Sequence, residues 1–470
     1  MTSRSLIAVL CLMLVAPWSV AALGASPSSP KSGVRDLTQI RSSQVLRVLV
    51  NQSRNSSALI KGERVGTESQ RLHALERFLT DTGSGRTLRL QMIPKAKGQL
   101  IAALLRGEGD LVAPGELLSV PRSAAITASD PVLKSVPLVL VGHKGQRRYQ
   151  RVEQLAGKTL ALPAGSAAGE VIVALNQRLV ARRLAPVSIE WADPSLAVED
   201  VLEMVQAGIY PLTVVEQPIA ERWARVWPSL RIDRRVPLGS PAHLNWYMRT
   251  DAPQLKASID RFLAGYRTPA NADLSLIKAY KGQAMLHYPL ASADRSRLEQ
   301  LRPALQRHAR EQQMDWLNLA ALAFKESRLN PSARGASGAT GLLQITPAAA
   351  RRVGVGSIRS VDDNVQAAAR YLALIRRQFF SSPRLNERER MAFTLAGYAM
   401  GPERVQAMRN EARRQGLNPD QWFFQTERIA LEQVGMGGVR HVNTVNKYYL
   451  ALERERSSLE QRPRSKAVSR

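Results

Sequence analysis

The chain has 470 residues, of which 44% are hydrophobic and 22% charged, a globular composition in a chain too long for one ordinary core. Its single Cys excludes an intramolecular disulfide. Lys and Arg number 66 against 39 Asp and Glu, so the formal net charge of +27 favours an anionic partner such as nucleic acid, anionic lipid or an acidic cell-wall polymer.

Residues 1–24 have the pattern of a signal peptide. An early Arg precedes an apolar run at 6–16, and small residues suitable for cleavage follow. The run is short for a membrane span and Pro17 interrupts it, although an uncleaved N-terminal anchor is the alternative. Cys11 lies inside this segment. We therefore expect an exported protein, and export argues against nucleic acid as a partner.

Residues 45–270, after a Ser- and Pro-rich linker at 25–44, alternate short apolar runs with segments of helical periodicity. Examples are "VLRVLV", "QRLHALERFLTDTG", "PLVLVGHKG" and "AVEDVLEMVQAGIYPLTVVE". This alternation predicts an α/β domain with parallel sheets. The apolar segments change near "DPVLKSVPLVLV", which indicates that the chain passes from one lobe to another.

The second half of the chain is predicted to be mainly helical. A linker is expected at 271–298, and nearly continuous helical periodicity follows at 299–455, as in "NVQAAARYLALIRRQFF". Residues 456–470 are charged and poor in apolar residues, so we expect a disordered basic tail. The chain is therefore predicted to be multi-domain.

Patterns of several other enzyme classes have little support. The six His residues are scattered without a second His or Cys at ligand spacing, so we expect no metal and no cofactor. The stretch "DTGSG" at 81–85 contains the Asp-Thr-Gly of an aspartic protease turn, but it occurs once, and Gly83 is well placed to end a helix. The sequence has no Gly-rich phosphate loop and no Gly-x-Ser-x-Gly motif.

Glu326 is the strongest candidate for catalysis. If 314–328 forms a helix, Glu326 follows the apolar residues of 319–323 at the spacings that place side chains on one helix face. Burial would raise the pKa of the carboxyl group, and a carboxylic acid that stays protonated near neutral pH can donate a proton to a glycosidic oxygen. The alternative is a Glu at a helix boundary that reaches solvent or pairs with an Arg.

The loop after Glu326 is consistent with a binding groove. Gly335, Gly338 and Gly341 would let a ligand approach the backbone closely, and Gln344 offers a donor and an acceptor to a sugar amide. A plain connection between two helices is the alternative.

Four motifs in order give the helical half a family resemblance. They are "KESRLNPSARGASGATGLLQITPAAARRVGV", "NVQAAARYL" (364–372), "LAGYAMGPERV" (395–405) and "RHVNTVNKYYLAL" (440–452). Together they resemble the soluble lytic transglycosylase (SLT) domain. The resemblance implies a lysozyme-like, mainly α domain at 299–455.

The first half resembles a periplasmic solute-binding domain of the amino-acid type (family 3). The stretches that carry the resemblance are "LIAALLRGEGDLVAPGELLSVPRSAAITASDPV" and "VEQLAGKTLALPAGSAAGEV". It implies a two-lobed α/β domain at 45–270. A solute-binding domain followed by an SLT domain, behind a signal sequence, is the arrangement of membrane-bound lytic murein transglycosylases of type F.

The resemblance implies a reaction and its residues. Glu326 would be the only catalytic acid/base, cleaving the β-1,4 bond between N-acetylmuramic acid and N-acetylglucosamine of peptidoglycan glycan strands without water, to leave 1,6-anhydromuramoyl ends. Ser327, Gln344 and Tyr398 match positions that hold the substrate. In the first domain, Arg122 would bind a ligand carboxylate, Ser166 would offer a hydroxyl, and Glu216 would pair with a ligand ammonium.

The chain departs from the family pattern at several positions. Ala399 stands where an Asn is expected after Tyr398, His441 replaces the usual Tyr before Val442, and Leu343 replaces a Met. Ala399 keeps open an alternative, in which the protein is a catalytically impaired periplasmic receptor or cell-wall-binding protein that senses amino acids or muropeptides. A transport receptor is a weaker alternative, because it leaves the helical half without a purpose.

The compartment and partners follow from these expectations. We expect the periplasm, with peripheral contact at the inner face of the outer membrane as an option, because the basic surface would be attracted to anionic lipid and cell-wall polymers. The expected partners are peptidoglycan glycan strands, and a muropeptide or an amino acid that regulates the enzyme from the first domain.

Overall fold

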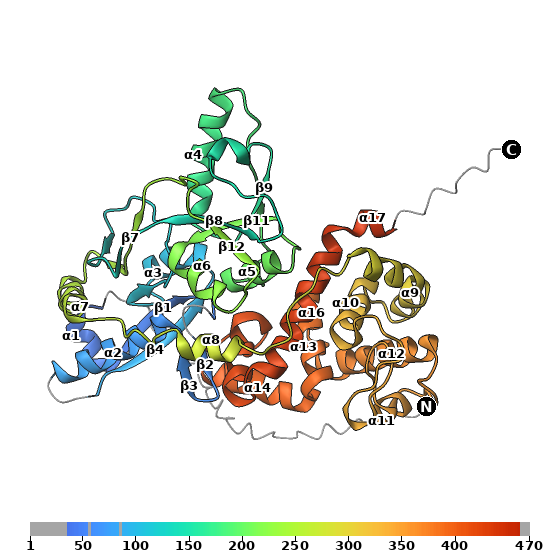
Figure 1. Ribbon diagram of the computed structural model, residues 1–470. Coiled ribbons are helices and arrows are strands. Elements are labelled where there is room, and N and C mark those ends of the chain that lie inside the picture. The colour runs from blue at the N-terminus through green and yellow to red at the C-terminus, as the bar shows by residue number, and fades with distance from the viewer. Residues whose placement is uncertain (1–34, 55–57, 84–86, 461–470) are drawn as a thin grey trace, which may run out of the picture. The chain divides into compact units, whose positions relative to one another are not determined.

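A computed structural model describes residues 35–54, 58–83 and 87–460 (Figure 1). The predicted signal peptide at 1–24 and the last residues of the predicted tail lie outside the described residues. The described residues from 35 to 460 belong to one compact unit.

The first lobe is built on a five-stranded sheet. Its strands, in spatial order, are β4 (Arg89–Lys95), β1 (Val45–Asn51), β5 (Leu111–Ala113), β14 (Tyr247–Arg249) and β6 (Ile126–Ala128). Strand β1 is parallel to β4 and β5, whereas β14 is antiparallel to β5 and β6. The helices of this lobe are α1 (Leu37–Ser43), α2 (Thr67–Asp81), α3 (Leu100–Leu105) and α7 (Pro253–Gly265).

The second lobe contains a separate, antiparallel sheet. Strand β8 (Leu138–His143) lies between β11 (Leu212–Glu216) and β12 (Leu230–Asp233) and runs antiparallel to both. A parallel pair joins β9 (Thr159–Leu162) to β10 (Ser188–Trp191). The helices of this lobe are α4 (Ala168–Ala181), α5 (Val198–Gln206) and α6 (Gln217–Ala224). The two-lobed α/β fold is confirmed, but the prediction of parallel sheets was wrong in part.

The reason for the antiparallel pairs is the path of the chain between the lobes. Strand β7 (Leu133–Val136) leads out of the first lobe and β13 (Ala242–Leu244) leads back, and the two pair antiparallel to each other. The returning segment then adds β14 to the first sheet in the opposite direction to β5. Alternation of strands and helices along the sequence does not reveal such a return.

The remaining chain is mainly helical, as predicted (Figure 1). Its longer helices are α9 (Ser292–Glu311), α10 (Trp316–Ser327), α12 (Val361–Phe379), α13 (Glu387–Met400), α14 (Pro402–Arg414) and α16 (Met436–Arg454), with α11 (Pro347–Arg352), α15 (Glu427–Gln433) and α17 (Arg456–Glu460) between or after them. Helix α10 packs against α9 and α16 and buries all its residues from Trp316 to Phe324 except Asn318.

Three predicted boundaries differ from the structure. Helix α1 lies inside the expected linker at 25–44, and α8 (Leu274–Tyr280) lies inside the expected linker at 271–298, with Tyr280 buried. Helix α17 occupies the start of the expected disordered tail, because Leu459 is fully buried. Isolated buried residues in polar segments give little periodic signal, so these short helices were missed.

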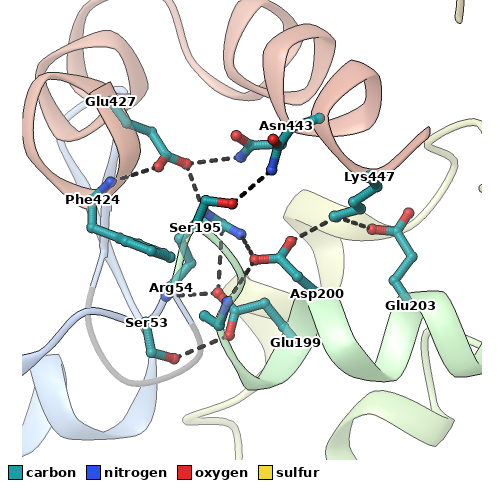
Figure 2. A network of polar contacts seen from close by, with 12 residues as sticks. Ser53, Arg54, Ser195, Glu199, Asp200, Glu203, Phe424, Glu427, Asn443 and Lys447 are labelled. Carbon is teal, nitrogen blue, oxygen red and sulfur yellow. Dashed lines mark hydrogen bonds and ion pairs between the residues drawn. The ribbon is translucent and has the colours of Figure 1, made fainter. Parts of the chain in front are cut away.

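Buried charges join the α/β half to the helical half (Figure 2). Arg54, which follows β1, donates to Asp200 on α5 at 2.5 Å and to Glu427 on α15 at 2.6 Å. Lys447 on α16 donates to Glu203 at 2.5 Å and lies 2.6 Å from Asp200. All five side chains are at most 7% exposed.

Burial and these ion pairs together shift the pKa values of Glu199 and Asp200, both on α5, in opposite directions. Burial, the largest influence, raises the pKa of Glu199, and repulsion from Asp200 adds to it. Burial acts on Asp200 in the same sense, but the charges of Arg54 and Lys447 outweigh it and lower the pKa of Asp200. We call this group of buried charges (Arg54, Asp200, Glu203, Glu427 and Lys447) the junction. Its stability therefore depends on the positive charges of Arg54 and Lys447.

Candidate active site

Glu326 lies in the last turn of α10, where a buried helix ends at the surface. The side chain of Asp315 accepts from Leu317 N at 3.1 Å and begins the helix, and Arg328 ends it in the left-handed conformation with φ 53°. The side chain of Glu326 is 17% exposed. The helix therefore carries a carboxyl group from the core to a position that a ligand can reach.

Glu326 is paired with a residue on a neighbouring helix. Nε2 of His441, on α16, lies 2.5 Å from Oε1 of Glu326, and the His441 side chain is only 11% exposed. Helices α10 and α16 are packed against each other, which brings the two residues together. In the described part of the chain, Oε2 of Glu326 has no hydrogen bond.

The pair changes the acidity expected for Glu326. Burial acts to raise the pKa of the carboxyl group, as the sequence predicts, but the hydrogen bond from His441, the largest opposing influence, and the charge of Lys325 lower it below its ordinary value. The predicted direction of the shift was therefore wrong, because the residue that reverses it lies on a distant part of the chain.

The loop behind Glu326 is held by backbone bridges and by Gln344. Thr340 bridges Arg334 on one side and Ile345 on the other. Gln344 has a positive φ of 49°, and its Nε2 donates to Ala333 O at 3.2 Å and to Gly341 O at 2.9 Å. These bonds fold the loop back on itself.

Asn364, on α12, holds the same loop through its carboxamide group. The sequence analysis did not predict a role for it. It is 1% exposed, its Oδ1 accepts from Leu343 N at 2.9 Å, and its Nδ2 donates to Thr340 O at 2.9 Å. The motif "NVQAAARYL" begins with this residue, so the resemblance marked the segment but not the contact.

Ser327 and Tyr398 bind two consecutive carbonyl groups of the loop. The Ser327 hydroxyl donates to Leu342 O at 2.8 Å, and the Tyr398 hydroxyl donates to Leu343 O at 2.7 Å. Burial, the largest influence, and the nearby charge of Glu326 raise the pKa of Tyr398 well above its ordinary value. The structure therefore gathers Glu326, Ser327, Gln344 and Tyr398 around one loop, and contact of the last three with substrate stays a prediction.

The residues predicted to bind a ligand in the first domain lie in three different settings. Arg122 is exposed, and Ser166 is half-buried at the start of α4, where its hydroxyl accepts from Ala168 N at 3.3 Å. Glu216 is buried and accepts from Leu117 N at 2.7 Å. Among the described residues, no hydrogen bond or ion pair joins any two of the three.

A cation of the protein itself, the Lys97 ammonium, lies next to Glu216. Nζ of Lys97 lies 4.0 Å from Glu216 and donates to Glu116 at 2.9 Å, and both Lys97 and Glu116 are buried. Burial, the largest influence, and the charge of Glu116 raise the pKa of Glu216. A cavity lined by Lys97, Ser166 and the half-exposed Trp191 opens beside this cluster.

The described residues also bear on metal binding and on membrane spanning. No group of three or more His, Cys, Asp or Glu side chains could hold a metal ion there. None of the helices at 35–54, 58–83 and 87–460 is both long and apolar enough to cross a membrane.

Comparisons with known proteins agree with the motifs. Residues 303–420 match the family model of the transglycosylase SLT domain, so Glu326, Ser327, Gln344 and Tyr398 lie inside the match. His441 lies beyond it. The match therefore covers three of the four segments whose motifs resemble that domain.

Curated relatives match most of the chain. Membrane-bound lytic murein transglycosylase F of Ectopseudomonas mendocina is 28% identical over 418 residues, which are 87% of this chain and 81% of the relative. The protein of the same name from Desulfosudis oleivorans is 24% identical over 91% of this chain and 94% of the relative. The similarity to membrane-bound lytic murein transglycosylase F that the sequence predicts is confirmed.

A solved structure resembles the first half. It is an amino acid ABC transporter substrate-binding protein from Streptococcus pneumoniae bound to L-arginine, with 19% identity, 52% of this chain and 95% of that chain covered, and a TM-score of 0.40.

Proposed function

We propose that this protein is a peptidoglycan lytic transglycosylase, a carbon–oxygen lyase, in which Glu326 is the only catalytic acid/base. The observation that carries the proposal is the setting of Glu326 inside the SLT match, at the partly exposed end of a buried helix, with Oε1 held and Oε2 free of hydrogen bonds among the described residues. A carboxyl group held on one side presents its other oxygen to a bound glycan.

The reaction needs one group that first gives and then takes a proton. Glu326 protonates the oxygen between N-acetylmuramic acid and N-acetylglucosamine, and the bond from that oxygen to the muramoyl anomeric carbon breaks. The muramoyl 6-hydroxyl then bonds to the same carbon and gives its proton to the Glu326 carboxylate. This closes a 1,6-anhydro ring, restores the acid and consumes no water.

The surroundings of Glu326 support a lyase rather than a hydrolase. Hydrolysis with inversion or retention uses a second carboxylate as base or nucleophile. The side chains that act on the pKa of Glu326 are those of His441 and Lys325, and neither is acidic. A single carboxyl group is sufficient for the intramolecular reaction.

The α/β half acts as a solute-binding module of the enzyme. Its ligand is an amino acid or a muropeptide, and Lys97 at the Glu216 carboxylate takes the place of a ligand ammonium. Regulation of the helical half by this module is consistent with the buried ion pairs that join them, including Arg54 with Glu427. The basic chain would work in the periplasm, peripherally attached to anionic membrane or wall surfaces.

The test is mass spectrometry of purified peptidoglycan digested with the protein and with Glu326→Gln. The carboxamide can still bind His441 but cannot donate or accept the catalytic proton. Glu299→Gln is the control, because it makes the same chemical change on α9 at a side chain that is 37% exposed.

Each outcome has a distinct meaning. Anhydromuropeptides from the wild type and Glu299→Gln, and none from Glu326→Gln, are expected. Reducing-end products would replace the lyase with a hydrolase. No products from the wild type would favour the receptor alternative, with Ala399 beside Tyr398 as the first position to restore to Asn.

A further inference from the structure

His441 is the one partner of the Glu326 carboxyl group among the described residues, and its imidazole is asymmetric. Nε2 lies 2.5 Å from Oε1, whereas Nδ1 is buried and has no hydrogen-bond partner in the described structure. One ring nitrogen therefore has a hydrogen-bond partner and the other has none. This difference favours one protonation state of the imidazole.

We propose that His441 is a positioning residue that works as a neutral imidazole, donating Nε2–H to Oε1 throughout the reaction, so that the catalytic proton is exchanged only at Oε2. The proposal rests on the proposed function of Glu326 and adds a residue that the SLT match at 303–420 does not contain.

The first argument concerns the ring. A neutral imidazole has one N–H donor and one bare nitrogen. With the proton on Nε2, the donor meets Oε1, and the buried Nδ1 is a bare acceptor. The other tautomer and the imidazolium would both bury an N–H at Nδ1 without an acceptor, which costs free energy. The Nε2–H tautomer thus fits the packing best.

The second argument concerns the carboxyl group. When Glu326 is a carboxylate, Oε1 accepts from Nε2–H as a charged oxygen. When Oε2 carries the proton, Oε1 is the carbonyl oxygen of the acid and accepts from the same N–H. One donor therefore serves both states, and the carboxyl group need not rotate between giving its proton to the glycosidic oxygen and taking one from the 6-hydroxyl.

The other ionisable groups near the pair do not compete for this role. Lys325 on α10 favours the carboxylate by its charge, and the Tyr398 hydroxyl on α13 is bound to Leu343 O. Arg440, next to His441 on α16, is directed to Glu203 at 3.2 Å. Tyr371 on α12 contacts the Tyr398 ring edge-to-face.

A matched pair of variants isolates the hydrogen bond. His441→Tyr and His441→Phe both replace the imidazole with a larger six-membered ring, so changes in packing are shared and only the hydroxyl donor separates them. Without a donor at position 441, the hydrogen bond that lowers the pKa of Glu326 is lost, while burial still raises this pKa and only the charge of Lys325 is left to oppose it. The pKa of the catalytic acid then rises in His441→Phe.

The pH profile of turnover gives the decisive readout. Because the acid must be protonated to cleave, turnover falls as the pH rises through the pKa of Glu326 in the complex. We expect this fall to move to higher pH in His441→Phe, with maximal kcat reduced about 10- to 100-fold, the range for loss of a hydrogen bond to a charged group. His441→Tyr should return the profile toward that of the wild type. A merely structural role would lower kcat in both variants without moving the fall.

A measurement without turnover separates this proposal from the proposed function. Heteronuclear NMR of the full chain with nitrogen-labelled histidine distinguishes a protonated ring nitrogen from a bare one, and His441→Tyr identifies the signals. We expect a protonated Nε2 and a bare Nδ1 at neutral pH, in the wild type and in Glu326→Gln. A proton on Nδ1, or on both nitrogens, would overturn the role of His441 whether or not the protein cleaves peptidoglycan, whereas a wild type without products would overturn the proposed function alone.

Discussion

The carboxamide of Asn364 fills the space in which a Cβ of Gly341 would lie. A Cβ built on Gly341 would be 2.7 Å from Cγ of Asn364, and Gly341 has a φ of +79°. Conformation and space therefore both require glycine at this point of the loop behind Glu326. The same carboxamide binds Leu343 and Thr340, so it cannot move aside without losing those hydrogen bonds.

Gly341→Ala should therefore disturb the loop more than its backbone conformation alone explains. Gly338→Ala is the matched control, because Gly338 has a similar φ of +75° but a Cβ there would meet nothing closer than Pro347 Cδ at 3.6 Å. We expect Gly338→Ala to lower the free energy of unfolding by about 1 kcal/mol, because alanine disfavours the left-handed conformation. Gly341→Ala should lose about 1–3 kcal/mol more, because its Cβ also overpacks the space held by Asn364. Thermal unfolding and anhydromuropeptide release measure both. Equal losses of stability in the two variants would contradict this prediction and show that the Asn364 side chain moves aside.

Glu389 makes stability depend on pH. It accepts from Trp422 N at 2.6 Å, and burial, the largest influence, raises its pKa from 4.5 to about 7. Between these values the folded chain keeps a proton that the unfolded chain has lost, so stability falls as the pH rises across this window. In Glu389→Gln this fall should be smaller by about 3 kcal/mol.

Urea unfolding at a series of pH values checks this prediction. Glu387→Gln is the control, since it lies on the same helix with its side chain 67% exposed. The prediction fails if Glu389→Gln and the wild type lose the same stability between the two pH values.

Glu326 shows which part of the candidate site can be predicted from the sequence. Helical periodicity placed it correctly at the end of a buried helix, because one helix face is a local property of α10. Its partner His441 is 115 residues away, and contact between α10 and α16 is a property of packing that periodicity does not encode. The direction of the pKa shift of Glu326 depends on that partner, so it was not predictable from the helix alone.

The fold shows the same division between local and distant information. The helices at 67–81 and 316–327 follow from their apolar patterns, whereas the antiparallel strand β14 joins a sheet that begins about two hundred residues earlier in the chain. Arg54 was also missed. Its acceptors Asp200 and Glu427 lie 146 and 373 residues further on, and a single Arg after a strand carries no signal of burial.

Arg54→Met should destabilise the whole described unit. The substitution leaves Asp200 and Glu427 buried without their shared cation, which costs about 3–5 kcal/mol. Arg234→Met is the control, because its ion pair with Glu221 is exposed and such pairs contribute about 0–1 kcal/mol. Calorimetry of the two variants makes the comparison. A loss for Arg54→Met no greater than for the control would mean that water enters the junction.

The net charge of +27 predicts that binding to the cell wall is sensitive to salt. Sedimentation with intact peptidoglycan sacculi measures this, and Glu326→Gln should be used so that the sacculi are not digested. Raising the salt from about 0.1 M to about 1 M shortens the Debye length from about 10 Å to about 3 Å, so most of the bound protein should be released. Binding that persists unchanged would exclude attraction by charge as its main cause.

The ion pairs of Lys447 cross from the helical half to the α/β half. Its carboxylate partners, Asp200 and Glu203, both belong to the α/β half, although Lys447 itself belongs to the helical half. Cutting the gene between the halves would thus strand a buried ammonium on one fragment and buried carboxylates on the other. The two fragments resemble the subunits of a permanent complex, and the segment between them serves as a tether that keeps their effective concentration high. Produced as separate chains in one cell, they should find each other and copurify.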